Sequence, residues 1–578
     1  MFLPKPPFNL GGFLLGLDNK NNCKIMDNQT KQCQTCKRDF VIRAEDLVFY
    51  EQVKTVPPLD CPDCRTMRRL VFRNERTLYK RSCDLCKKDI ISLYTKDSKY
   101  TIYCSECWWS DKWDPKSFAQ DYDANKTFFE QYGELQRKVP RLALMNLNSV
   151  RSEYTNGAAD NKDCYLIFAA DDNQDCLYGR LLQRSKGCVD CAFIYDSESC
   201  YECIDAHACS KCLYCEQCQS SVGLIFCYNM RNSNDCVFCT NGRNISNSIF
   251  NVKYTKEEFE KKKAEIFSSY ESIEQAKKEF AELKSKTMVK YASQVKCHNV
   301  TGDYLFNCYD GVRVFDTSDS KNCSYMADTD GPIDSADCNN YYYKSELCYN
   351  MMGILQSSKC KNCAFVFYSN EVEYSENCHN LTSAIGCNAI RKGEYMVLNK
   401  EYSKEEFYKI KGQIDEQMKR DGTYGQFFPA KLAPFGFNET LGYEYFPITE
   451  NEAKERGFNW QNQTTGTFGK ETIKEEDMPQ TIIEVADDIL KEVLVCKDCK
   501  KNFRITKAEL DFYKRMNLPL PHKDFECRHQ DRMKKRNPRK LWHRQCMKPG
   551  CTNEFETSYS PDRKEIVYCE ACYQQEVA

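Results

Sequence analysis

The chain has 578 residues, among them 38 cysteines, and its 82 basic and 84 acidic side chains give a formal charge of −2. This length allows several domains with hydrophobic cores, so the cysteines are not needed as disulfides that hold a small domain together. No stretch approaches eighteen consecutive apolar residues, and residues 1–22 carry neither a basic leader nor a cleavage pattern. We therefore expect a cytoplasmic protein without a membrane partner, in which CxxC pairs bind metal more often than they form disulfides.

The charge is unevenly distributed along the chain. Residues 33–107 carry a net charge of +4 and residues 496–572 carry +8, so the remainder carries −14. Basic ends around an acidic body favour anionic partners at the ends, although such charges are also common on solvated faces.

Two pairs of CxxC motifs follow an N-terminal extension (residues 1–30) and predict paired zinc ribbons over residues 31–110. A CxxC turn supplies two thiolates, and a second turn completes the four ligands that zinc takes in a structural site. The expected ligands are Cys33, Cys36, Cys61 and Cys64 in the first site, and Cys83, Cys86, Cys104 and Cys107 in the second. A redox dithiol is the alternative, but each pair has a second pair nearby.

A linker with a helix (residues 111–157) precedes a twelve-residue repeat over residues 158–252. Its unit is S-x-x-C-x-x-C, with cysteines at positions 164, 176, 188, 200, 212 and 236 and Leu224 in the remaining place. Small residues at every third position suit the narrow interior of a β-solenoid, whose rungs lie about 4.7–4.9 Å apart. The residue after each of these positions is apolar, which predicts an apolar strip that needs a cover. A coil of twelve residues and one of twenty-four both fit the pattern.

The repeat has its densest cysteines between Ser197 and Cys218. We interpret these sulfurs as core, because sulfurs on successive rungs would be much farther apart than the ~2.05 Å of a disulfide. A local zinc site is the alternative, and its candidate ligands are Cys209, Cys212, Cys215, Cys218 and His207.

A looser copy of the repeat occupies residues 296–400, and each copy is followed by a predicted helix. The first helix or helical hairpin spans residues 253–295 and the second spans residues 401–421. Thr255 with Glu258, and Ser403 with Glu406, form capping boxes at the two starts. Residues 422–490 combine an aromatic-rich irregular segment with an acidic linker.

Paired zinc ribbons are predicted again over residues 491–578. CKDCKKNFRITKAELDFY near the C-terminus matches CQTCKRDFVIRAEDLVFY near the N-terminus. The expected ligands are Cys496, Cys499, Cys527 and His529, then Cys546, Cys551, Cys569 and Cys572, which brings the expected number of zinc ions to about four. His529 is proposed because the chain has no cysteine three residues after Cys527.

Both eighteen-residue stretches resemble the predicted bacterial zinc-ribbon family whose pattern runs CxxC, a phenylalanine, a short helix ending in FY, a proline region and CxxCR. SYSPDRKEIVYCEACYQ and YGQFFPAKLAPFGFNETLGYEYFP resemble parts of uncharacterised bacterial multi-domain proteins that carry this ribbon at both ends. The resemblance covers most of the chain and implies the zinc sites and the domain order, but no activity. His529 departs from the family pattern.

The sequence therefore predicts a mainly β fold: two cysteine-rich β-solenoid-like repeat arrays, each followed by a helix, flanked by paired α+β zinc ribbons. It contains no phosphate-binding glycine loop, HExxH or GxSxG motif, so we expect no catalytic activity. A carbohydrate-active enzyme is a remote alternative, for which Asp171, Asp172 and Asp175 are the candidate acids. Turn aspartates in solvent are the favoured explanation of these three residues.

We expect binding of RNA or single-stranded DNA through the basic segments between the paired zinc sites. Cations contact phosphates and aromatic rings stack on bases. The candidate contacts are Arg68, Arg69, Arg73, Tyr79, Lys534, Lys535, Arg539 and Trp542. The alternatives are a protein-protein interaction scaffold, a solvated helix face, and a contact between these segments and the acidic body.

Overall fold

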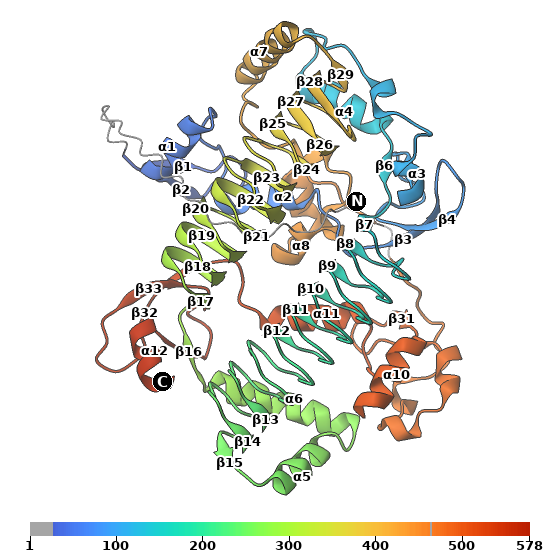
Figure 1. Ribbon diagram of the computed structural model, residues 1–578, viewed down its shortest axis with the longest axis vertical. Coiled ribbons are helices and arrows are strands. Elements are labelled where there is room, and N and C mark those ends of the chain that lie inside the picture. Colours follow the sequence, from blue (N-terminus) through green and yellow to red (C-terminus); the bar gives the residue numbers. More distant parts are fainter. Residues whose placement is uncertain (1–26, 463–464, 578) are drawn as a thin grey trace, which may run out of the picture.

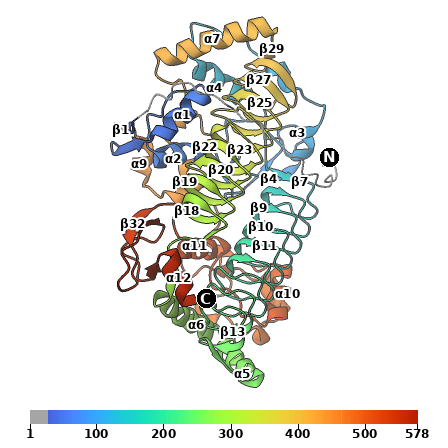
Figure 2. The same cartoon turned by 60° about the vertical axis from the view of Figure 1, so that its left-hand side comes forward.

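The computed structural model describes residues 27–462 and 465–577 of the chain, so most of the predicted N-terminal extension lies outside the described residues. Most of the regular structure is β-strand, with helices and small cysteine-bearing modules packed around two long ladders (Figure 1). We name the ladders array 1 (residues 146–251) and array 2 (residues 294–399), and the modules A (29–72), B (79–109), C (494–536) and D (542–577). Figure 2 shows the two arrays side by side, with the modules around them.

Array 1 is a stack of short parallel strands in which each residue pairs with the residue twelve positions later. Tyr165 pairs with Leu177, for example, and Leu177 pairs with Val189. One turn of the stack therefore takes twelve residues, not twenty-four. Its strands are β7 (Asn146–Leu147), β8 (Asn156–Ala159), β9 (Phe168–Asp171), β10 (Arg180–Gln183), β11 (Ala192–Tyr195), β12 (Ile204–His207), β13 (Asn234–Val237) and β14 (Ser246–Ile249), closed by the antiparallel β15 (Val252–Lys253).

Within each turn, every third side chain lies in the interior. Cys188, Cys191 and Ile194 are completely buried in one core cluster with the equivalent residues of neighbouring turns. The residue before each interior position has a positive φ, as Asp190 does at 53°. Asn and Asp adopt this left-handed conformation more readily than other residues with a side chain. Their abundance in the repeat is therefore a backbone requirement, and it needs no catalytic explanation.

The thiols of the interior cysteines form hydrogen bonds with backbone carbonyls of their own turn. The thiol of Cys188 donates to the carbonyl of Lys186, 3.5 Å away, and the same contact to the residue two positions earlier recurs along the array. Serines in a neighbouring column do the same with their hydroxyls and also accept the amide of the next turn, as Ser197 does from Cys209. All cysteines of the described residues are free thiols.

The alternative of a local zinc site in the dense stretch is not supported among the described residues. Cys209, Cys212, Cys215 and Cys218 donate to backbone carbonyls and belong to no group within reach of one metal ion. The His207 side chain is half exposed and pairs with Asp196 at 3.3 Å. These sulfurs are core, as the repeat predicts.

Array 2 follows the same plan with eleven-, twelve- and thirteen-residue turns. His298 pairs with Tyr309 and Ile333 pairs with Glu346, and a register shift occurs beside Gly302. A Cβ at Gly302 would lie 1.7 Å from the Val314 carbonyl oxygen, so this irregular turn requires glycine. The strands are β17 (Gln294–Val295), β18 (His298–Phe306), β19 (Tyr309–Ser318), β20 (Lys321–Ser324), β21 (Ala327–Asp330), β22 (Ile333–Tyr343), β23 (Tyr349–Leu355), β24 (Ala364–Phe367), β25 (Asn370–Glu373), β26 (Glu376–His379), β27 (Leu381–Ile385), β28 (Gly393–Val397) and the antiparallel β29 (Lys400–Glu401).

Each array leads into a helix through the predicted capping box. The Thr255 hydroxyl accepts from the amide of Glu258 at the start of α5 (Lys256–Ile266), and Ser403 accepts from Glu406 at the start of α7 (Lys404–Arg420). A second helix, α6 (Tyr270–Ser285), completes a hairpin with α5. The apolar strip of array 1 is buried under α5, α6 and module C, so its predicted cover is present.

The remaining segments pack around the ends of the arrays. Between module B and array 1 lie the 3-10 helix η1 (Pro115–Phe118), α4 (Phe128–Lys138) and β6 (Arg141–Leu142), and β16 (Met288–Lys290) precedes array 2. The aromatic-rich segment 422–462 contains α8 (Leu441–Tyr445) and α9 (Glu450–Glu455) and buries Phe427, Phe428 and Phe437 against array 2 and α4. Among the described residues, no helix is long and apolar enough to cross a bilayer.

Candidate metal centres

Each module begins with a hairpin that carries two cysteines. The hairpins are β1–β2 (Gln29–Gln32, Asp39–Ile42), β3–β4 (Tyr79–Ser82, Asp89–Ser92), β30–β31 (Leu494–Val495, Asn502–Phe503) and β32–β33 (Trp542–Gln545, Glu554–Thr557). In modules A, B and C the residue after the second cysteine is left-handed: Lys37, Lys87 and Lys500 have φ of 61°, 63° and 62°. Their amides return to the carbonyl of the first cysteine at 2.9–3.1 Å, which turns both thiols to the same side.

The other two cysteines of modules A, B and D lie at a helix N-terminus. Cys61 is the N-cap of α2 (Pro62–Leu70), and Cys104 is the N-cap of α3 (Ser105–Trp109). In module D, Cys569 directly precedes α12 (Glu570–Val577), and β34 (Ile566–Tyr568) leads into it. The positive end of a helix dipole favours the thiolate form that a metal needs.

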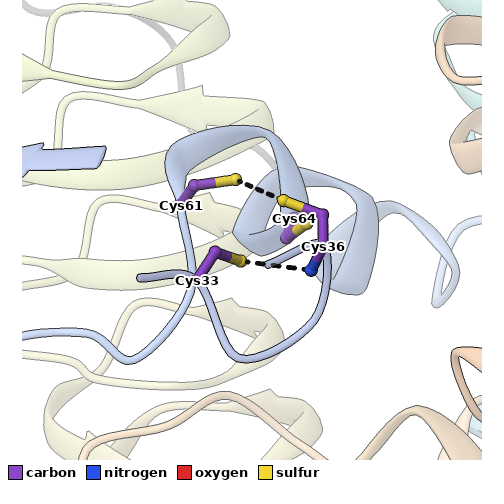
Figure 3. Close-up of side chains that lie close together, drawn as sticks. All are labelled: Cys33, Cys36, Cys61 and Cys64. Atoms are coloured by element: carbon purple, nitrogen blue, oxygen red, sulfur yellow. Dashed lines mark hydrogen bonds between the residues drawn. The ribbon is translucent and has the colours of Figure 1, made fainter. Parts of the chain in front are cut away.

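The distances between sulfurs suit a tetrahedral metal. Cys36 and Cys61 Sγ of module A, drawn in Figure 3, are 3.7 Å apart. Cys86 and Cys104 Sγ are 3.8 Å apart in module B, and Cys551 and Cys569 Sγ are 3.9 Å apart in module D. A zinc-sulfur bond of about 2.3 Å gives a tetrahedron edge of about 3.8 Å, whereas a disulfide is about 2.05 Å long. In each group the potential ligand atoms lie within 4.8 Å of one another. Three groups of four cysteines could thus each hold one metal ion, and the ligand set fits zinc.

In modules A and D, the pKa of the cysteine at the start of the helix is lowered, which favours the thiolate form that a metal needs. A hydrogen bond from Cys64 lowers the pKa of Cys61 to about 5. Burial raises the pKa of Cys569, but the Asn553 side chain and the Cys572 amide outweigh it, so the pKa falls to about 6. Modules A and D therefore each have a cysteine that ionises easily and can start the assembly of a thiolate site.

In module C the structure corrects the predicted fourth ligand. Asp524, not His529, joins Cys496, Cys499 and Cys527 as a possible ligand. Asp524 is the N-cap of α11 (Phe525–Lys535): one carboxylate oxygen accepts the amide of Cys527 at 2.8 Å, and the other lies 3.4 Å from the Cys499 sulfur.

His529 lies on the opposite side of the helix from these ligands. Its Nε2 is 3.3 Å from a Glu444 carboxylate oxygen, and the side chain is buried. Burial and the nearby Arg76 lower its pKa to about 4, so this histidine is neutral. D-x-x-C-R in module C thus occupies the place of C-x-x-C-R in module A, and Asp524 stands where module A has Cys61.

The basic residue after the last cysteine of modules A and C does not face solvent. In α2, Arg65 donates to both carboxylate oxygens of Asp337 at 3.0 Å, and Arg69 reaches the same carboxylate at 3.2 Å. All three side chains are at most 6% exposed. Module A is therefore fixed to array 2 by two arginines on one buried aspartate.

Module C repeats this contact on the other array. Arg528 and Arg532 of α11 donate to Asp190 at 3.1 and 2.8 Å, and both are buried. Asp190 and Asp337 are both left-handed residues that directly precede an interior cysteine. A tyrosine from each module adds a ring contact: Tyr50 with Tyr349 at 5.4 Å, and Tyr513 of α10 (Lys507–Met516) with Tyr201 at 5.9 Å. Module A near the N-terminus thus holds array 2, and module C near the C-terminus holds array 1.

Modules B and D extend the starts of the arrays. β5 (Ile102–Tyr103) of module B pairs with β6, just before array 1, and β34 of module D pairs with β16, just before array 2. Module B is thus paired with the segment that leads into array 1, and module D with the segment that leads into array 2.

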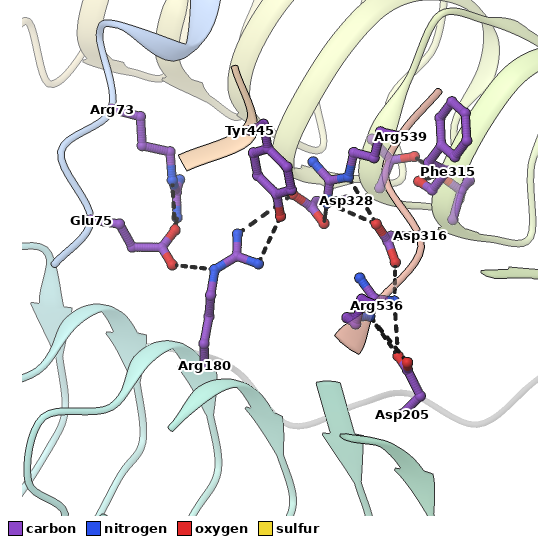
Figure 4. A network of polar contacts seen from close by, with 12 residues as sticks. Arg73, Glu75, Arg180, Asp205, Phe315, Asp316, Asp328, Tyr445, Arg536 and Arg539 are labelled. Carbon is purple, nitrogen blue, oxygen red and sulfur yellow. Dashed lines mark hydrogen bonds and ion pairs between the residues drawn. The ribbon is translucent and has the colours of Figure 1, made fainter. Parts of the chain in front are cut away.

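Charged residues after α2 and α11 join the two arrays (Figure 4). Arg180 of array 1 donates to Glu75 at 2.8 Å, and Glu75 also pairs with Arg73. Arg536 bridges Asp205 of array 1 and Asp316 of array 2, at 3.0 and 2.6 Å. The basic segments between the paired modules therefore neutralise the acidic arrays at their junction.

These contacts change the interpretation of the predicted nucleic-acid residues. The Arg69, Arg73 and Arg539 guanidinium groups are occupied by carboxylates of the same chain and are buried or nearly so. Arg68 pairs with Asp60, and the Tyr79 hydroxyl donates to Glu439 at 2.6 Å. The alternative of a contact with the acidic body describes Arg69, Tyr79 and Arg539. Arg68 and Arg73 pair instead with the nearby carboxylates of Asp60 and Glu75. All five side chains are thus engaged within the chain and are not presented to a phosphate or a base.

The other three candidates remain accessible. Lys534 is 75% exposed at its side chain, Lys535 is half-buried, and Trp542 is half-buried under the ammonium group of Lys540. The two lysines line a cleft of about 650 Å³ between α6, α11 and array 1. Acidic and basic side chains alternate along its walls, so the cleft is not a basic channel.

Sequence reasoning missed Asp190, Asp337 and Asp524. A signal for the first two existed: the last metal-site cysteine is followed by arginines at the same two positions, Arg65 and Arg69 in one copy and Arg528 and Arg532 in the other. Arginines four residues apart lie on one helix face and indicate one shared anion. The candidate acids Asp171, Asp172 and Asp175 are exposed on array 1, and the last two are left-handed turn residues.

Comparisons with known proteins add little to this description. No family model matches the chain, and no curated protein matches it. Among solved structures, the crystal structure of a "putative acetyltransferase" from Desulfovibrio desulfuricans G20 aligns with 46% of this chain and 68% of its own, at 10% identity and a TM-score of 0.10. A likeness of this size carries no argument about fold or function.

Proposed function

We propose that this protein is a non-catalytic, zinc-stabilised scaffold for protein-protein interaction. Four zinc ribbons, each holding one structural zinc ion, clamp two cysteine-cored β-solenoids into one body. The observation that carries the proposal is the reciprocal clamp: two buried arginines from each half of the chain meet one buried aspartate in the other half.

The position of the arginines couples metal binding to this clamp. Arg65 directly follows Cys64, and Arg528 directly follows Cys527, so metal ligand and clamp residue share one helical turn. A module of about forty residues has little hydrophobic core, and a structural zinc site contributes folding free energy directly. Loss of the metal should therefore release the arginines as well.

The closed ligand sets argue against metal catalysis. A zinc ion with four protein ligands has no open position for water or a substrate. A scaffold instead explains why the buried charged, cysteine and aromatic side chains join the modules to the arrays.

Metal analysis of the purified protein tests the proposal. We expect about four zinc ions per chain, and removal with a strong chelator should raise hydrogen exchange in α2 and α11 while the interior turns of array 1 stay protected. Fewer than two zinc ions per chain, or unchanged exchange after complete removal, would contradict the zinc-dependent clamp.

Binding of RNA or single-stranded DNA is the second candidate. It rests on the accessible basic end of α11 at Lys534 and Lys535. Titration with mixed RNA and DNA at two salt concentrations tests it, because phosphate contacts weaken steeply as salt rises. The Lys534→Gln/Lys535→Gln variant should lose any such binding, with Lys256→Gln/Lys261→Gln on α5 as the matched control.

A further inference from the structure

The C-terminal ends of the two arrays have the same backbone but different surroundings. Both end in a left-handed pair followed by a two-residue antiparallel strand: Phe250 and Asn251 before β15, and Leu398 and Asn399 before β29. In both, the asparagine side chain accepts an amide of the previous turn, Thr240 in array 1 and Asn388 in array 2. The two ends are therefore equivalent, residue by residue.

The end of array 2 is covered by residues 115–128 of the same chain. The amide of Gln120 donates to the Leu398 carbonyl at 3.2 Å, and Asn399 donates to the carbonyl of Pro115 at 3.0 Å. Phe128 packs in the same apolar cluster as Leu398, which is completely buried.

Charges complete this contact. Lys116 pairs with Glu401 of β29 at 2.9 Å, and Asp121 pairs with Lys400 at 2.5 Å. The Tyr402 hydroxyl also donates to Asp121, at 3.3 Å. The covering segment thus contacts each of the two residues of β29 through a side chain of opposite charge.

The end of array 1 has no such cover among the described residues. Phe250 is 42% exposed, Val252 is 58% exposed and Tyr254 is 39% exposed. These residues occupy the places of Leu398, Lys400 and Tyr402. Figures 1 and 2 both place β15 and α5 at one extremity of the molecule, away from modules A and B.

We propose that this end of array 1, formed by residues 250–254, is a docking surface for a short segment of another protein. The chemistry of the segment follows from the equivalent cover on array 2. An acidic side chain should face Lys253, where Lys116 faces Glu401. In place of Asp121, a neutral hydrogen-bond acceptor should face Tyr254, because Val252 stands where array 2 has Lys400. An apolar side chain should cover Phe250.

The surface deepens the proposed scaffold function by giving the partner a place and a chemistry. The backbone supports it, because the Phe250 carbonyl is in the position at which Leu398 accepts a backbone amide. Exposed strand ends with apolar side chains invite this kind of pairing.

Two peptides test the proposal. One is residues 111–130 of this chain, and the other is the same peptide with Lys116→Glu and Asp121→Asn, which matches Lys253 and Tyr254. We expect the altered peptide to bind the full-length protein at least tenfold more tightly than the native peptide, measured by fluorescence anisotropy.

A charge exchange on the protein should reverse this preference. The variant Val252→Lys/Lys253→Glu carries the charges of β29, so it should prefer the native peptide by a similar factor. If neither peptide binds, or if the preference does not reverse, the proposal is wrong.

Sedimentation of the unmodified protein distinguishes the other occupant. A concentration-dependent dimer that disappears in Val252→Lys/Lys253→Glu would mean that a second copy covers this end, and it would overturn the partner proposal. Zinc content separates failure of the docking surface from failure of the zinc scaffold. The variant should contain as much zinc as the parent protein, whereas a wrong zinc scaffold would show as low zinc content in the parent itself.

Discussion

Replacement of Asp337 by Asn should detach module A from array 2. Asn has nearly the same shape and tolerates the left-handed conformation that Asp337 has at φ 57°, so only the negative charge is lost. The buried guanidinium groups of Arg65 and Arg69 then lack their counter-charge. Removal of one partner of a buried ion pair costs about 3–5 kcal/mol. Because Asn339 and Asn350 also accept from Arg69, at 2.7 and 2.9 Å, we expect the lower end, about 3 kcal/mol.

Hydrogen exchange followed by mass spectrometry measures this local loss. A change of about 3 kcal/mol corresponds to exchange about two orders of magnitude faster in α2, because each 1.4 kcal/mol is a factor of ten. Asp334→Asn is the matched control, since Asp334 lies in the same array at φ 44° and its side chain accepts an exposed hydrogen bond from Asn322. Equal exchange of α2 in the Asp337 variant and the control would refute the clamp.

Three further predictions concern single residues. Asp524→Ala should lower the zinc affinity of module C whereas His529→Ala should not, as competition with a chelator would show; the opposite order would restore the histidine ligand. Burial and Arg391 lower the pKa of His379 from 6.5 to about 4, so unfolding binds a proton and stability falls as pH drops from about 6.5 toward 4. The loss at pH 5 should be about 2 kcal/mol. In His379→Gln, the melting temperature should therefore fall less between pH 7.5 and pH 5 than in the parent, and an identical fall would contradict the assignment. Cys200→Ser should cost less than about 1 kcal/mol, because interior serines already donate to the carbonyl two residues earlier; a loss above about 2 kcal/mol in urea unfolding would show that the sulfur itself is needed.

The sequence was informative wherever a residue's role depends on local geometry. Twelve-residue spacing predicted the parallel ladders, the apolar strip and the buried thiols, because each depends on which residue follows which around one turn. The cysteine groups of modules A, B and D were also predicted correctly. In these modules, two cysteine pairs at a suitable distance leave few other arrangements.

The sequence was misleading wherever a role depends on contacts between distant segments. Arg69 and Asp337 are 268 positions apart, and no local pattern shows that a basic helix will meet one buried carboxylate. Basic composition was therefore interpreted as a surface for phosphates. Asp524 was missed for a different reason: we aligned Cys527 with Cys61, whereas the helix start aligns Cys527 with Cys64 and Asp524 with Cys61.

The reciprocal clamp also constrains how the chain can fold. Module A is complete within the first 72 residues, but its arginines find Asp337 only after array 2 has been made. Arg528 of module C, in turn, finds Asp190 of array 1, which lies 338 positions earlier in the chain. The hairpin and helix of each module can form locally around a metal ion, since their ligands lie within forty residues of one another. A metal site formed early would keep each arginine pair on one helix face until the opposite array is available. In this view the metal sites do more than stabilise the four small modules, because they also prepare the charged helices that join the two halves of the chain.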